Sequence, residues 1–287
     1  MDVVALVGIG LLTGMTTVLF GFGGGFVAVP VVVWADAALG GDAMRVATAT
    51  SALVMVVNAG FATAVTPRRV LLALRGRGAL LLLLAAGAVA GALATRLAPA
   101  GPARWAFISY VALTIADLLL RPGFLRSTRG SGCGAGPREP GMIQTRGASR
   151  AEAPSDAPGP LPAVLGAPIG AVAAFLGVGG SVMTVPAMRR AGHTMRVATT
   201  LANPLTLAIA LPATAVSLGG ATVPAAAHAH VQLAGLIDVR AAAALLLGAL
   251  PVIAVLRRRP PRIPDRVHAW AYIGLLATVT VAMLCSA

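Results

Sequence analysis

Two clusters of glycine are the residues of this chain best suited to chemistry, because glycine lets a ligand approach the backbone closely. The first cluster is Gly21-Phe-Gly-Gly-Gly-Phe-Val-Ala-Val-Pro30, and the second is Gly177-Val-Gly-Gly-Ser-Val-Met-Thr-Val-Pro186. Each cluster interrupts a long apolar run. A half-helix that starts after such a break presents free amide hydrogens and the positive end of its dipole, which bind anions. The candidate anion-binding residues are Gly23, Gly24, Gly25, Gly179, Gly180 and Ser181.

A different interpretation of the same glycines is that they only let helices pack closely, as small residues commonly do in membranes. The duplication of the whole cluster, with a proline five positions after its last small residue, favours the break. The two prolines, Pro30 and Pro186, lack a backbone donor and are expected to shape the break rather than bind a ligand.

A second string is also duplicated. Met44-Arg-Val-Ala-Thr48 returns letter for letter as Met195-Arg-Val-Ala-Thr199, in the same order relative to the glycine clusters. Shared motifs in a shared order indicate an internal duplication. The arginines of the strings, Arg45 and Arg196, fall at the predicted membrane boundary. They are either cationic guards at the mouths of a pathway or helix-end arginines that reach the lipid headgroups.

Small polar residues follow each string within about three helical turns. Their hydroxyl and amide groups could line a cavity and donate hydrogen bonds to an oxyanion, or they could hold neighbouring helices together. The residues of this kind are Thr48, Thr50, Ser51 and Asn58 in the first half and Thr199, Thr200 and Asn203 in the second.

The composition predicts an all-α integral membrane protein. Hydrophobic residues make up 57% of the chain, charged residues only 11%, and the mean hydropathy is +0.87, whereas a soluble domain has roughly 45–50% apolar and about 25% charged residues. The net charge of +13 comes from 22 basic residues. All 22 are arginines, and most lie between apolar runs, so they indicate membrane orientation rather than a nucleic-acid partner.

Eight hydrophobic segments are expected, four in each of two repeats, and the first segment of each repeat is broken at its glycines. A membrane-crossing helix needs about 20 apolar residues. The predicted domains are a first transmembrane repeat at 1–120, a flexible cytoplasmic linker at 121–160 and a second transmembrane repeat at 161–287. The expected segments are 3–35, 46–66, 78–97, 103–120, 161–188, 197–218, 239–256 and 267–285.

The arginines test the path of the chain, because cytoplasmic loops carry the excess of positive charge. If all eight segments cross, the arginines divide evenly between the two sides. If each glycine-broken segment bends back as a hairpin, only Arg45, Arg96, Arg104 and Arg240 lie on one side and the other eighteen on the opposite side. Three crossings per half then make the repeats inverted, as in many secondary transporters. As an alternative, an additional membrane-crossing segment within 219–237 also places more arginines on one side, but the excess is smaller.

Other kinds of site are not indicated. None of the nine acidic residues lies in the middle of a predicted span, and Asp117 is expected to pair with Arg121 one turn later. His228 and His230 have no further ligand at metal-site spacing. No catalytic constellation or cofactor motif is present, so an enzyme, a metal centre and a cofactor are not predicted. A non-transporting membrane scaffold and a metal-ion permease using the two histidines are kept as alternatives.

The motifs together resemble those of the TauE/SafE sulfite exporter family. The resemblance is carried by the glycine break before Val-Ala-Val-Pro30, by Arg45-Val-Ala-Thr-Ala-Thr-Ser51, by Thr95-Arg-Leu-Ala-Pro99 and by the doubled order. It implies a secondary transporter in the bacterial inner membrane that moves small sulfur-containing anions, such as sulfite or organosulfonates, by alternating access. The second half departs from the pattern at Ser181, Leu201 and Ala202.

Overall fold

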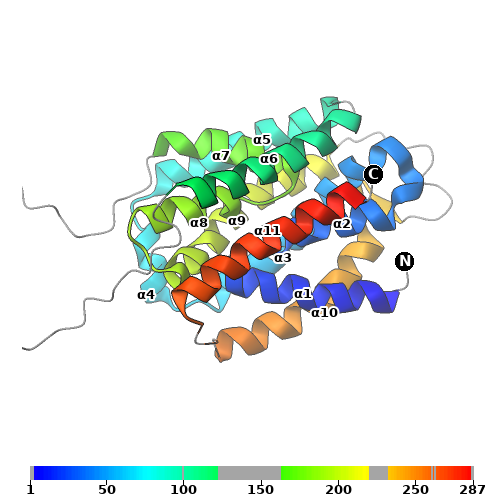
Figure 1. Ribbon diagram of the computed structural model, residues 1–287. Coiled ribbons are helices and arrows are strands. Elements are labelled where there is room, and N and C mark those ends of the chain that lie inside the picture. Colours follow the sequence, from blue (N-terminus) through cyan, green and yellow to red (C-terminus); the bar gives the residue numbers. More distant parts are fainter. Residues whose placement is uncertain are drawn as a thin grey trace, which may run out of the picture.

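The computed structural model describes residues 3–98, 100–121, 163–219, 232–259, 261 and 263–285. The predicted linker lies almost wholly outside these residues, as do Cys133, His228 and His230 and most of the alternative span at 219–237. Within them the chain is almost entirely helical (Figure 1). The prediction of an all-α membrane protein is confirmed.

The first half contains four long helices and four short ones, two of which are 3-10 helices. It consists of α1 (Val3–Phe20), α2 (Gly25–Ala35), the 3-10 helix η1 (Ala37–Asp42), α3 (Ala43–Ala64), α4 (Arg68–Leu71), η2 (Leu72–Leu74), α5 (Gly78–Leu97) and α6 (Ala100–Leu120). The predicted glycine break therefore separates α1 from α2.

The second half repeats this order. It consists of η3 (Ala163–Leu165), α7 (Gly166–Leu176), α8 (Ser181–Arg190), α9 (Met195–Leu218), the short antiparallel strands β1 (Leu233–Ala234) and β2 (Ile237–Asp238), α10 (Val239–Arg258) and α11 (Asp265–Cys285). Two polar side chains cap its helices. Thr194 accepts a hydrogen bond from the amide of Val197 at the start of α9, and Asp238 accepts from Arg240 and Ala241 at the start of α10.

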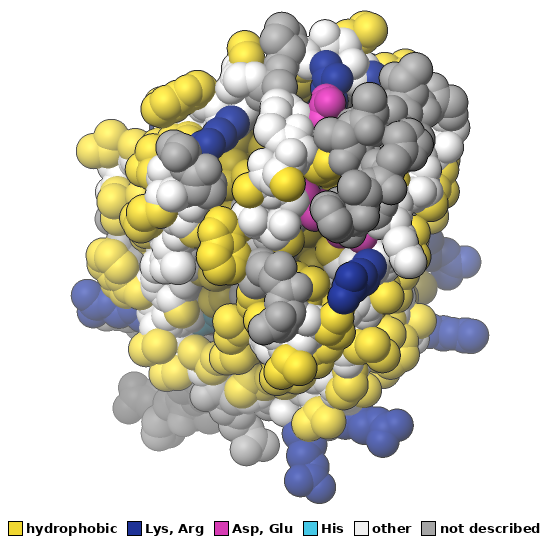
Figure 2. All heavy atoms as spheres, turned by 90° about the vertical axis from the view of Figure 1, so that its right-hand side faces the viewer, with side chains coloured by type: hydrophobic (Ala, Val, Ile, Leu, Met, Phe, Trp, Pro, Cys, Tyr) yellow, Lys and Arg dark blue, Asp and Glu magenta, His cyan; other side chains and the backbone are white. Residues whose placement is uncertain are grey.

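Among the described residues, seven helices are long and apolar enough to cross a membrane: α1, the η1–α3 segment, α5, α6, α9, α10 and α11. Their outer faces carry large exposed apolar side chains, including Leu82, Leu113 and Leu247, which are each at least 67% exposed. A soluble monomer rarely exposes so much apolar surface. These outer faces are suited to contact lipid. Figure 2 looks onto the end of the bundle that carries both termini, where hydrophobic side chains also cover much of the surface.

The two ends of the bundle are defined by contacts between helix termini. At one, called here the Arg45 end, Arg45 at the start of α3 donates to the carbonyl of Ala98, 2.6 Å away, and Arg104 in α6 donates to Met283 near the end of α11, at 2.7 Å. At the other, called the Arg196 end, Arg190 of α8 pairs with Asp117 near the end of α6. Figure 1 places both termini at the Arg45 end.

Each broken segment enters and leaves at one end of the bundle. The α1–α2 hairpin starts from the Arg45 end and returns to it, and the α7–α8 hairpin starts from the Arg196 end and returns there (Figure 1). The two hairpins thus point in opposite directions. An inverted repeat requires this arrangement, and the inverted repeat itself stays a prediction.

Close glycine packing holds each hairpin in place. A Cβ atom added to Gly10 or Gly14 of α1 would lie 2.4 or 2.5 Å from a carbonyl oxygen of α10. At Gly87 and Gly91 of α5 the corresponding distances to carbonyl oxygens of α7 are 2.0 and 2.1 Å. Spacing of small residues by four positions lets two membrane helices approach to backbone contact. The first arm of each hairpin is therefore fixed against a helix of the opposite half.

Candidate functional site

The two glycine clusters, far apart in sequence, meet between the middles of α3 and α9. A Cβ added to Gly23 would lie 3.0 Å from Thr206 Cγ2 and 3.3 Å from Met55 Cγ. A Cβ added to Gly179 would lie 2.9 Å from Met55 Sδ and 3.1 Å from Thr206 Cγ2. The same two side chains thus touch both breaks. The two breaks therefore lie close together in the fold.

Positive φ angles at the breaks explain why they are made of glycine. Gly21, Gly23 and Gly24 have φ of 75°, 62° and 84°, and Gly177 and Gly179 have 70° each. Residues with a Cβ rarely adopt this region. One side chain of the opposite half also anchors each break: Thr206 donates to the carbonyl of Gly21 (3.4 Å), and the Ser51 hydroxyl lies 3.1 Å from the carbonyl of Gly177.

The first break is flanked by polar side chains. A Cβ at Gly24, which caps α2, would lie 2.3 Å from Thr13 Cγ2, 2.8 Å from Asn58 Nδ2 and 3.3 Å from Thr17 Oγ1. Asn58 is fully buried, and neither its Nδ2 nor its Oδ1 has a hydrogen-bond partner among the described residues. A buried amide without a partner costs about 1–3 kcal/mol. Its position beside the free amides of a helix start is suited to an oxyanion.

The second break is flanked differently. A Cβ at Gly180 would lie 2.5 Å from Ile209 Cδ1 and 3.9 Å from Ile169 Cγ2. Its polar groups are the hydroxyls of Ser181 and Thr184, which are buried and have no partner among the described residues. The duplicated breaks therefore have unequal linings, with an amide and threonines beside the first and isoleucines with two hydroxyls beside the second.

A cavity opens at the Arg196 end. Its volume is about 840 Å³, and its lining includes Thr194, Arg196, Thr199, Thr200, Arg257 and His268. The matching place at the Arg45 end, lined by Arg45, Thr48, Thr95 and Arg96, holds only about 10 Å³. Thr199 also borders the first break, because its carbonyl oxygen would lie 2.4 Å from a Cβ on Gly21. Thr199 thus lies between this cavity and the first break.

The two duplicated arginines lie at opposite ends of the bundle, as expected, and they differ in their contacts. Arg45 pairs with Asp42 at 3.1 Å and donates to Ala98. Arg196 is exposed and lines the large cavity. Its backbone carbonyl accepts hydrogen bonds from the Thr199 and Thr200 hydroxyls, whereas its guanidinium makes no hydrogen bond or ion pair with any other described residue. The predicted pair of Asp117 with Arg121 is present at 2.9 Å, and Arg190 joins it.

The remaining site residues predicted from the sequence make contacts within the helix bundle. Thr50 accepts a hydrogen bond from the amide of Asp238 and so anchors the start of α10. The Asn203 amide donates to the carbonyl of Thr199 at 3.3 Å, while its Oδ1 is buried without a partner among the described residues. Gly25 packs against the Met55 thioether. Of these, Asn203 retains an unused polar atom.

Sequence reasoning missed Thr13, Thr17, Met55, Thr184 and Thr206. Thr13 and Thr17 stand four residues apart in a mostly apolar helix and share one of its faces, which is a usable signal. Met55 and Thr206 had no such signal. They are equivalent positions of the duplication, 151 residues apart like the strings that precede them, and only the fold shows that both lie between the breaks.

Comparison with known families decides the classification. The family model described as sulfite exporter TauE/SafE matches residues 6–283. The chain belongs to the TauE/SafE family. Membership implies a membrane permease or exporter of sulfur-containing anions, and the family consists of transporters rather than enzymes. The comparisons with curated proteins and with solved structures gave no match. Within the described residues of this TauE/SafE protein, no three His, Cys, Asp or Glu side chains gather as a metal site.

Asp36, between α2 and η1, makes stability depend on pH. It is 5% exposed, and burial, followed by the nearby carboxylate of Asp238, raises its pKa to about 6 from 3.8. Between these values the folded protein holds a proton that the unfolded chain has lost. Stability is therefore lost as pH rises through about 6.

We expect Asp36→Asn to stabilise the folded protein at pH 7.5 by up to about 3 kcal/mol, and so to raise its melting temperature in detergent. Near pH 4 the substitution should have little effect. Identical pH profiles for variant and wild type would contradict this.

Proposed function

We propose that the protein is a secondary transporter of small sulfur-containing oxyanions in the bacterial inner membrane, and that the anion binds where the two glycine breaks meet. The observation that carries the proposal is the unpartnered amide of Asn58 beside Gly24. Two kinds of donor, the side-chain amide and the free backbone amides that begin α2, converge there in a buried place. Such preorganised donors are what an oxyanion needs on leaving water.

Alternating access is supported by the difference between the two ends. A cavity of about 840 Å³ opens at the Arg196 end, while the equivalent space at the Arg45 end is almost filled. Under the arginine rule the Arg196 end is cytoplasmic, so this conformation is open to the cytoplasm. Inverted repeats reach the opposite state when each half adopts the conformation of the other. The Met55 side chain, which now fills the space between the breaks, would have to move aside when substrate binds.

The unequal linings favour an organosulfonate over sulfite. A sulfonate group would accept hydrogen bonds near Gly24 and Asn58, and its carbon substituent would lie towards Ile209 and Ile169 near Gly180. Sulfite has no apolar part to bury against the isoleucines. Burying even one methylene against an apolar wall contributes about 0.8 kcal/mol.

Transport into proteoliposomes tests the proposed function. We expect the purified protein to take up radiolabelled methanesulfonate and sulfite, with the lower KM for methanesulfonate, and to move chloride and sodium at the rate of empty liposomes. The reason is that only the sulfonate satisfies both linings. A well-folded, monodisperse preparation that moves no sulfur oxyanion would instead support the scaffold alternative.

A further inference from the structure

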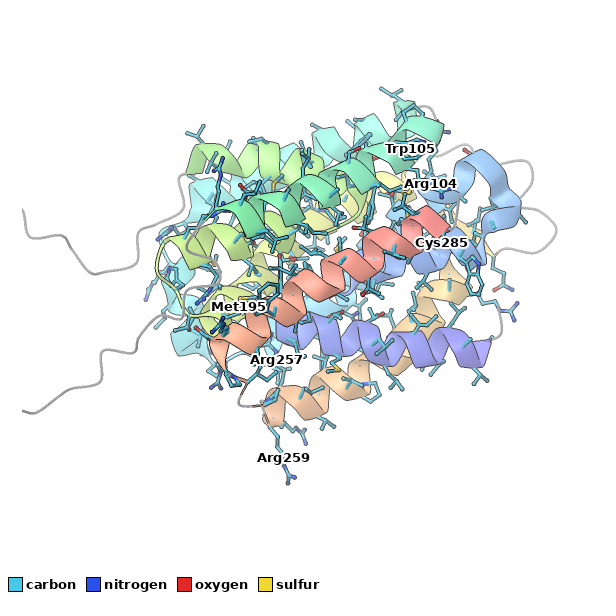
Figure 3. The ribbon with its side chains drawn as sticks, in the orientation of Figure 1. Arg104, Trp105, Met195, Arg257, Arg259 and Cys285 are labelled. Carbon is cyan, nitrogen blue, oxygen red and sulfur yellow. The ribbon has the colours of Figure 1, made fainter. Side chains whose placement is uncertain are left out.

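The cavity at the Arg196 end contains a second cation that no motif indicated. Arg257 lies in the last turn of α10 and lines this cavity together with Arg196. Its Nε and Nη2 are buried and have no hydrogen-bond partner among the described residues. In Figure 3 Arg257 lies at the same end as Met195, the neighbour of Arg196, whereas Arg259 points away from the bundle. A guanidinium with buried, unused donors is costly unless an anion pairs with it.

Nothing among the described lining residues supplies that anion. Asp265 is the carboxylate of the cavity wall, and it pairs with Arg189 at 3.0 Å. His268 lies with its Nε2 2.6 Å from the carbonyl of Leu19. The hydroxyl-bearing residues Thr194, Thr199 and Thr200 add polar groups without charge. The described lining therefore offers two cations whose charge no carboxylate of the wall balances.

The opposite end shows what the equivalent arginines do when the space is closed. Arg257 is the nineteenth of the twenty residues of α10, and Arg96 is the nineteenth of the twenty residues of α5. Arg96 lines the small space at the Arg45 end together with Arg45. It donates to the carbonyls of Val216 and Gly219, at the end of α9. The arginine pair is thus duplicated. Nε of Arg96 and Nε of Arg257 are both buried without a partner among the described residues, but Nη2 is used in Arg96 at the closed end and unused in Arg257 at the open end.

We propose that Arg196 and Arg257 form a second anion-binding site, which captures a small sulfonate or related oxyanion in the open cavity before it reaches the glycine breaks. The forked guanidinium of each arginine matches two oxygens of such a group. When the cavity closes, Arg257 turns to the carbonyls at the end of α3, where Val65 already lines the cavity. The site then disappears and its anion is released towards the breaks. The inference extends the proposed function but has a binding test of its own.

The test measures binding of methanesulfonate by calorimetry to the full chain in nanodiscs of phosphatidylcholine. We expect Arg257→Gln and Arg196→Gln each to weaken binding about tenfold, the effect of losing one charge-assisted hydrogen bond. Arg259→Gln is the matched control, because it removes the same charge from an exposed side chain two positions away. We expect its affinity to equal that of the wild type. Equal affinities for Arg257→Gln and Arg259→Gln would overturn the proposal, as would a wild type that binds no methanesulfonate.

A lipid headgroup carries the same anionic oxygens and is the other source of a ligand. Nanodiscs containing phosphatidylglycerol distinguish the two sources. If the arginine pair binds free anions, adding this lipid changes the affinity for methanesulfonate by less than about twofold. If anionic lipid abolishes the Arg257-dependent binding, the pair is a headgroup site and the proposal is wrong. Failure of transport with intact Arg257-dependent binding would instead count against the proposed function alone.

Discussion

We expect Gly24→Ala to reduce transport about tenfold or more, while leaving the amount of folded protein sufficient to measure. A Cβ at this position would meet Thr13 Cγ2 at 2.3 Å and Asn58 Nδ2 at 2.8 Å. The φ of 84° adds about 1–2 kcal/mol of backbone strain. The methyl group would therefore displace Asn58 and the start of α2, which together form the proposed oxyanion site. Uptake of radiolabelled methanesulfonate, normalised to monodisperse protein, is the measurement.

Gly76→Ala is the matched control for the strain. Gly76 has a φ of 83°, and a Cβ there would meet no atom within 4 Å. It carries the same backbone cost without the clash, so we expect near wild-type transport. Adding Thr13→Ser to Gly24→Ala removes the closest clashing atom and should restore part of the activity. If Gly24→Ala and Gly76→Ala reduce transport equally, backbone strain alone explains the loss, and the proposed oxyanion site near Gly24 is wrong.

The second break should tolerate the same change better. Gly180 has an ordinary negative φ of −74°, and its closest neighbour is the flexible end of the Ile209 side chain. A Cβ there requires only a rotation of Ile209. Gly24 and Gly180 are therefore equivalent in the duplication but differ in backbone conformation and neighbours. The sequence alone did not show this difference.

Local signals in the sequence predicted the helices well. The third segment was expected at 78–97, and α5 has the same bounds. Length of apolar run and the position of glycine are properties of neighbouring residues, and a membrane leaves few alternatives to a helix. A bend at each break was expected on two grounds. The arginine count requires a reversal in the second half, and the shared motif extends it to the first.

The contents of the site were harder to predict. Thr13 of α1 and Asn58 of α3 come together only because the chain turns at the first break and places Gly24 between them. The correspondence of Arg257 with Arg96 could not be recognised from the sequence, because the ends of α10 and α5 have few residues in common. Which polar atoms stay unpartnered depends on contacts between distant segments, and no periodicity records those contacts. Membership of the TauE/SafE family identified the class of substrate but assigned no residue to it.

The sharpest test of Asn58 is a substitution that should stabilise the protein while reducing its transport activity. Asn58→Leu removes two buried polar atoms that have no partner among the described residues, each of which costs about 1–3 kcal/mol. The melting temperature in detergent should therefore rise. Methanesulfonate transport should fall about tenfold or more, because a hydrogen bond to a charged group is worth about 1.5–3 kcal/mol. A site that binds substrate retains this kind of locally unfavourable residue.

Asn203→Leu gives the comparison. Its Nδ2 already donates to the carbonyl of Thr199, so this substitution removes an existing hydrogen bond and should raise the melting temperature less. A purely structural Asn58 would show the reverse pattern, with stability lost and the remaining folded protein fully active. Opposite signs for stability and transport in Asn58→Leu would therefore identify a residue whose hydrogen bonds are reserved for the anion, and they would place the oxyanion in the first half of the duplicated site.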